Sequence, residues 1–152
     1  MTQIKTAELV GAALDWAVAK CDGNAVSIIK YEYVTGYTNK CTGTRRMINA
    51  EPLCFDEDGE QFNPSTDWAQ GGPIIEREGI NLRAIRQDGH SMNGQWLSAY
   101  DDGNTGSMVR WVKRADWPRH YWQGTTPLIA AMRCYVASKL GDMVEVPKEL
   151  IK

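Results

Sequence analysis

The sequence has no excess of positive charge and no long apolar run, and each absence excludes a class of protein. Its 152 residues include 17 Lys and Arg against 19 Asp and Glu, for a net charge of −2. Proteins that coat nucleic acid usually carry a basic surface, so we expect no bulk nucleic-acid binding. No apolar segment approaches the ~20 residues of a membrane span, and the N-terminus lacks a signal-peptide pattern. We therefore expect a cytosolic protein that does not enter membranes.

Cysteine and histidine are scarce, with four and two residues respectively. The cysteines form no C-x-x-C pair, so we expect free thiols that pack as small hydrophobic side chains. A zinc site would have to combine Cys41 and Cys54 with His90 or His120. That spacing matches no strong ligand pattern. We expect no metal and no cofactor.

The signatures of common enzyme classes are also absent. The sequence contains no serine nucleophile elbow, P-loop lysine, paired-histidine metal motif or dinucleotide fingerprint. His90 and His120 lie in separate segments, and neither is placed to activate a nucleophile. Asp67 and Glu76 would suit hydrolysis as a carboxylate pair, but the sequence does not give their separation. We expect a non-enzymatic protein without catalytic residues.

The length of the chain is typical of one domain, which we place at residues 1–152. A first helix is predicted near its start. Apolar residues recur every three or four positions over residues 6–21, and Gly23 is placed to end the helix. Gly11 costs about 1 kcal/mol relative to Ala inside a helix. Its presence therefore indicates close packing at that point.

The second predicted helix spans residues 127–140 and has clear signals at both ends. Thr126 is placed as its N-cap, Pro127 takes the first helical position, and Gly141 follows the last turn. The segment is apolar on more than one face. We therefore expect the protein to form a homo-oligomer.

Extended segments are predicted between these helices. They are residues 25–34, residues 45–55, residues 80–85 and a strand that opens at Ile74 and Ile75 after Pro73. Residues 95–100 and 107–113 alternate in polarity, and the six residues between them are all turn formers. We interpret this pair as a hairpin. The sequence thus predicts an α+β fold: an antiparallel sheet with a central hairpin, packed by N-terminal and C-terminal helices.

Two polar segments have both a functional and a structural interpretation. The acidic residues 56–60 resemble part of a calcium loop, but the glycine is misplaced, which favours a solvated turn. Residues 116–124 interleave aromatic and basic side chains, as in proteins that stack on bases. The alternative is a long loop that folds its aromatic residues onto the sheet.

The most specialised stretch is residues 63–78. Ser65 or Thr66 can cap a short helical turn there, and Asp67 complements its exposed amides. Gly71 and Gly72 let the backbone approach another group closely. Trp68 has two interpretations: a plug of the hydrophobic core, or a platform on which a ligand stacks.

The predicted ligand site combines this stretch with the hairpin and the second helix. Trp68 supplies a stacking face, Arg77 a planar fork for phosphate or carboxylate, and Gln70 a donor and an acceptor for a base edge. The site residues are Asp67, Trp68, Gln70, Gly71, Gly72, Glu76, Arg77, Trp96 and Thr126.

Several blocks of the chain resemble the NinX family of phage and prophage proteins. These are residues 5–9 with 13–19, residues 64–80, Trp96 with Ala99, and residues 126–147. Together they cover a little under half the chain. Residues 22–62 match no family pattern. Residues 116–124 form an extension that the shorter family pattern lacks. The resemblance implies a phage-encoded protein of the bacterial cytoplasm without an established catalytic mechanism.

Two functions are compatible with these features. In the first, the protein binds and sequesters a small nucleotide-type signal of bacterial defence, since Trp, Gln, Arg and a helix N-terminus suit such a pocket. In the second, it is an adaptor or inhibitor whose aromatic loops bind a host or phage protein. Titration of purified protein with nucleotides separates the two.

Overall fold

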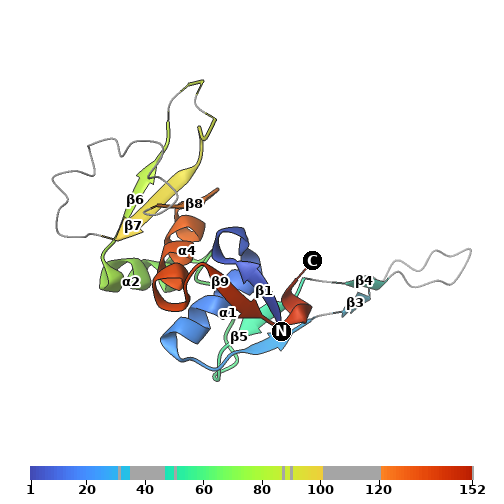
Figure 1. Ribbon diagram of the computed structural model, residues 1–152. Coiled ribbons are helices and arrows are strands. Elements are labelled where there is room, and N and C mark those ends of the chain that lie inside the picture. Colours follow the sequence, from blue (N-terminus) through green and yellow to red (C-terminus); the bar gives the residue numbers. More distant parts are fainter. Residues whose placement is uncertain are drawn as a thin grey trace, which may run out of the picture.

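A computed structural model describes residues 1–30, 32–34, 47–49, 51–86, 88–89, 91–100 and 121–151 (Figure 1). Its strands are β1 (Thr2–Lys5), β2 (Ser27–Ile29), β3 (Glu32–Val34), β4 (Met47–Asn49), β5 (Leu53–Phe55), β6 (Ile80–Ala84), β7 (Trp96–Tyr100), β8 (Trp122–Gly124) and β9 (Met143–Val146). Its helices are α1 (Gly11–Asp22), α2 (Trp68–Glu78) and α4 (Pro127–Leu140), with 3-10 turns at Thr6–Glu8 and Lys148–Leu150. No helix within these described ranges is long and apolar enough to cross a membrane.

The described strands pair antiparallel, which confirms the α+β class. β1 pairs with β9, β2 with β5 and β3 with β4, while β7 lies between β6 and β8. β7 matches the first strand of the predicted hairpin, and β6 forms a hairpin with it. The predicted partner, residues 107–113, lies outside the described residues.

The core is built around α4, whose side chains are buried along most of its length. The buried residues are Leu128, Ala130, Ala131, Met132, Cys134, Tyr135 and Val136. α4 contacts α1, α2 and the β6–β7–β8 sheet (Figure 1). Its apolar surface is therefore covered within the chain. The homo-oligomer remains a prediction, but this helix no longer supplies its reason.

The first helix begins later than its sequence pattern predicts. Thr6–Glu8 forms a 3-10 turn, and α1 starts at Gly11, where φ is +52°. No atom lies within 4 Å of a Cβ built on Gly11. The prediction of close packing at Gly11 is therefore wrong, since this glycine serves a left-handed backbone angle. Gly23 ends α1 in the left-handed conformation, as predicted.

The predicted strand at Ile74 and Ile75 is wrong, because both residues lie inside α2. Proline has no amide hydrogen to donate to the carbonyl four residues earlier, that of Ala69, and both Pro73 and Ala69 lie at exposed positions. Ile74 is buried against the core. This burial compensates for the helix-breaking tendency of proline. The N-cap is Asp67, which accepts a hydrogen bond from the Ala69 amide at 2.9 Å, rather than Ser65 or Thr66.

Candidate functional site

The polar residues at the start of α2 are occupied within the chain. The Gln70 side-chain oxygen accepts from the Asn63 amide at 2.9 Å, and its nitrogen donates to the Gln61 carbonyl at 2.8 Å. Asp67 caps the helix. Gln70 and Asp67 therefore hold the preceding loop against α2. The side-chain oxygen and the side-chain nitrogen of Gln70 both have hydrogen-bond partners within the chain.

Trp68 lies on the surface of α2 and is 55% exposed. A Cβ built on Gly72 would lie 4.0 Å from the indole Cε3, so the ring runs along the helix over Gly72. This exposure excludes the core-plug interpretation. Trp68 offers an aromatic face to solvent.

The neighbouring glycine, Gly71, has a packing role. A Cβ at this position would lie 2.6 Å from Leu128 Cδ2 and would overlap the Pro64 carbonyl oxygen. Only glycine therefore lets α2 approach both the loop before it and the first turn of α4. Leu128 lies two residues after Thr126, so this contact brings the start of α2 to the start of α4.

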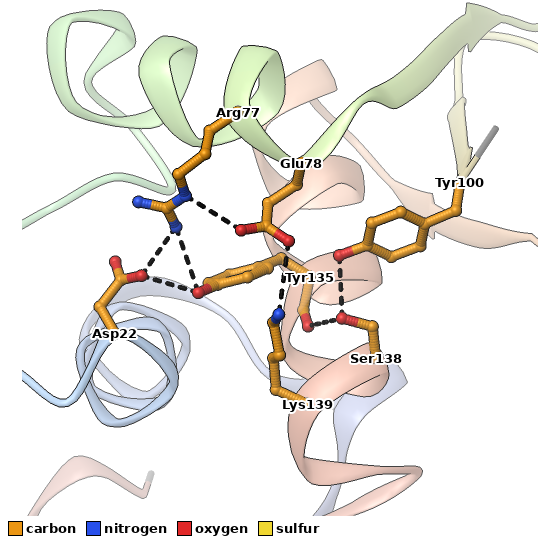
Figure 2. Close-up of polar contacts among 7 residues, drawn as sticks. All are labelled: Asp22, Arg77, Glu78, Tyr100, Tyr135, Ser138 and Lys139. Atoms are coloured by element: carbon orange, nitrogen blue, oxygen red, sulfur yellow. Dashed lines mark hydrogen bonds and ion pairs between the residues drawn. The ribbon is translucent and has the colours of Figure 1, made fainter.

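Arg77 lies near the other end of α2, inside a network of polar side chains (Figure 2). Its Nη2 donates to Asp22 Oδ1 at 2.7 Å and to the Tyr135 hydroxyl at 3.2 Å, and its Nε donates to Glu78 at 3.0 Å. The hydrogen bond with Glu78 is the main reason that the pKa of Arg77 is raised. The guanidinium fork therefore already binds two carboxylates.

The remaining members of this network complete its charge balance. Lys139 lies 3.5 Å from Glu78, and the Tyr135 hydroxyl donates to Asp22 at 2.7 Å. Burial raises the pKa of Tyr135, so its hydroxyl stays protonated at neutral pH. The two cations and two carboxylates cancel. The network joins α1, α2 and α4, and its described members carry no net charge that would attract an anion (Figure 2).

The last three predicted site residues, Trp96, Thr126 and Glu76, fall in two separate places. Trp96 pairs with Gly124 across β7 and β8, and a Cβ on Gly124 would lie 2.9 Å from the Thr126 carbonyl oxygen. The Thr126 hydroxyl accepts from the Ile129 amide at 3.2 Å, which confirms it as the N-cap of α4. Trp96 and Thr126 thus lie near each other. Glu76 is exposed near the far end of α2, beside Arg77.

A cleft opens where the β6–β7 hairpin turns. The Ile85 amide donates to the Gln95 carbonyl at 2.8 Å and the Gly94 amide donates to the Ile85 carbonyl at 2.9 Å, so the pairing continues past both strands. The cleft has a volume of about 390 Å³. It is lined by Ala84, Ile85, Arg86, Asp88, Asn93, Gly94, Gln95 and Trp96.

This cleft combines an aromatic wall with a guanidinium, a carboxylate and carboxamide groups. Trp96 is half-buried, whereas Arg86 and Asp88 are exposed and carry opposite charges. Asn93 and Gln95 add carboxamides. Trp96 was predicted from the sequence, but the polar residues before it were given no ligand role. The available signal was the accumulation of Arg, Asp, Asn and Gln immediately ahead of a tryptophan.

A buried carboxylate, also absent from the predicted site, supports the loop before α2. Asp15 on α1 is 4% exposed, and its Oδ1 accepts from the Ser65 amide at 2.8 Å. Burial raises the pKa of Asp15 to about 6, against the lowering effect of this hydrogen bond. Asp15 therefore positions the loop that leads to α2.

The metal candidates have ordinary structural partners where the structure describes them. Cys54 donates its thiol to the Ala12 carbonyl at 3.4 Å, while Cys41, His90 and His120 lie outside the described residues. Asp56 accepts from the amides of Asp58 and Glu60, as expected for a turn. Within the described ranges, no three His, Cys, Asp or Glu residues gather in a way that suits a metal ion.

Comparison with known proteins places these features in a family. No curated protein matches the chain. A family model described as bacteriophage P22, NinX matches residues 5–139. The matched range contains all of α1 and α2, the β6–β7 cleft and nearly all of α4. Because this match spans well over half of the sequence, the chain belongs to the NinX family of bacteriophage P22.

Proposed function

We propose that this NinX protein is a non-enzymatic phage accessory protein that binds a small nucleotide-type ligand in the Trp96 cleft. The observation that carries the proposal is an aromatic wall beside a cation, a carboxylate and two carboxamides in one cleft of about 390 Å³. Ligand sites typically have volumes of about 300–1,000 Å³ and combine apolar walls with a few polar groups. Sequestration of a bacterial defence signal in the host cytoplasm is the role we propose.

The proposed position differs from the one suggested by the sequence for a chemical reason. Arg77 and Gln70 already bind groups of the chain, so a ligand at α2 would have to displace those bonds. In the Trp96 cleft, Arg86 is exposed and lies beside the aromatic wall. A base can stack on Trp96 while Arg86 pairs with its phosphate.

Titration calorimetry with a panel of linear and cyclic nucleotides tests this proposal. Trp96→Leu keeps apolar bulk but removes the stacking face, so affinity should fall by about ten- to a hundredfold. Arg86→Ala, at an exposed position, should weaken binding while leaving the fold intact. Trp68→Leu on α2 is the matched control and should bind normally. Absence of heat with every nucleotide would end the proposal.

A second candidate function, a protein adaptor or inhibitor, is favoured by the exposure of Trp68. Exposed tryptophans are enriched among residues that dominate protein interfaces. A host or phage protein that binds through α2 should be retained by immobilised wild-type protein and by Trp96→Leu, but lost with Trp68→Ala. Equal retention by all three proteins would exclude Trp68 as the contact.

A further inference from the structure

The charged groups of the Trp96 cleft restrict which nucleotide it can hold. Among the described residues, its lining contains one cation, Arg86, and one carboxylate, Asp88. The charges of these two described residues cancel, so together they supply no surplus of positive charge for a triphosphate. A carboxylate also only accepts hydrogen bonds. A base that meets Asp88 must therefore present donors.

The common bases differ in the donors on their pairing edges. Guanine presents two adjacent donors, N1–H and the N2 amino group, which match the two oxygens of one carboxylate. Adenine and cytosine present one amino group beside a ring-nitrogen acceptor, which repels a carboxylate. The single N–H of uracil lies between two carbonyl oxygens. Only guanine pairs with a carboxylate through two hydrogen bonds without a repulsive contact.

Building on the proposed function, we infer that the cleft selects a guanine nucleotide of low charge, with Asp88 as the residue that recognises the base. Trp96 provides the stacking face and Asp88 accepts from N1–H and the N2 amino group. Arg86 then meets the phosphate. A monophosphate or cyclic phosphate suits one guanidinium, whereas each further phosphate adds negative charge beside Asp88.

Calorimetry with four monophosphates tests this selection. GMP should bind about ten- to a hundredfold more tightly than AMP, because a bidentate pair contributes discrimination of that size. IMP has the guanine ring without the N2 amino group, so its affinity should lie between them. XMP, which places a carbonyl where guanine has the amino group, should bind weakly.

The variant Asp88→Asn changes recognition in a defined direction. Asparagine accepts from N1–H but donates with its amide nitrogen. It should therefore lose the preference for GMP and gain one for XMP, whose carbonyl accepts that bond. Asp58→Asn, at an exposed aspartate in the turn after β5, is the matched control and should retain the GMP preference.

The outcomes separate this inference from the proposed function. Equal binding of GMP and AMP that depends on Trp96 would overturn guanine selection while leaving nucleotide binding intact. A GMP preference that survives Asp88→Asn would show that another group reads the base, which also overturns the inference. Absence of binding by all four nucleotides and by cyclic GMP would remove both.

Discussion

At the scale of single residues, Gly71 and Gly72 of α2 allow a direct comparison, because the first is tightly packed and the second has space around it. Gly71→Ala would place a methyl group against the Pro64 carbonyl and Leu128 and should destabilise the protein by about 1–3 kcal/mol. Gly72→Ala meets only the Trp68 ring at ordinary contact distance and should stabilise the helix by up to about 1 kcal/mol. Urea unfolding measures both. Equal effects of the two substitutions would contradict the packing role of Gly71.

The buried carboxyl of Asp15 should make stability depend on pH. Its folded pKa of about 6 lies above the ordinary value of 3.8. Protonation therefore favours the folded state, and the free energy of unfolding should fall as the pH rises from about 4 through about 6. This difference of roughly two pH units between the folded and ordinary pKa of Asp15 corresponds to about 3 kcal/mol in the free energy of unfolding.

Asp15→Asn isolates this effect, because the amide oxygen can still accept from Ser65 but carries no charge. The variant should be more stable than wild type at pH 7 and should lose the pH dependence between 4 and 6. Asp15→Ala lacks the acceptor and should be less stable than Asp15→Asn. Thermal unfolding of the three proteins from pH 4 to 8 measures this. A less stable Asp15→Asn protein at pH 7 would argue against a buried charge.

At the scale of elements, the sequence predicted those whose signals are local. α4 was predicted with both boundaries because Thr126, Pro127 and Gly141 mark its ends directly. α2 was missed because Pro73 disfavours a helix locally. The compensating contacts of Ile74 with the core and of Gly71 with Leu128 arise only in the folded chain. The β6–β7 pairing was also missed, because it too arises only in the folded chain.

The cap of α4 gives a test at this scale. Thr126→Ala removes the acceptor of the Ile129 amide and should cost about 1 kcal/mol. Thr125→Ala alters the exposed neighbouring threonine, which does not cap the helix, and should be close to neutral. Urea unfolding compares the two variants. A similar loss in both would mean that the cap contributes little to the stability of α4.

At the scale of the whole molecule, the closure of the fold and the candidate site lie at separate places. Thr6 joins the beginning of the chain to the segment after α4, because its hydroxyl donates to the Gly141 carbonyl at 2.6 Å and its amide to Asp142 at 2.9 Å. The β6–β7 hairpin extends away from α4 toward the turn that forms the cleft (Figure 1). Changes in the cleft should therefore leave the core intact.

This arrangement also explains how much of the candidate site the sequence could predict. Trp96 was identified because its residue type suits stacking. Arg86 and Asp88 line the same cleft as Trp96 only because β6 and β7 pair. No local sequence pattern indicates that pairing. Arg77, which was expected beside Trp68, is separated from it because α2 is a helix, which places the two residues about 13 Å apart along its axis.

The most direct test of the account locates the ligand by NMR. In a ¹⁵N-labelled protein, each tryptophan contributes its own indole N–H signal, so Trp96 and Trp68 report on the cleft and on α2 independently. Titration with GMP should shift the Trp96 indole and the amides of Arg86, Gly94 and Gln95, while the Trp68 indole stays in place. Shifts that gather at Trp68 and α2, or no shifts at millimolar GMP, would contradict nucleotide binding in the Trp96 cleft.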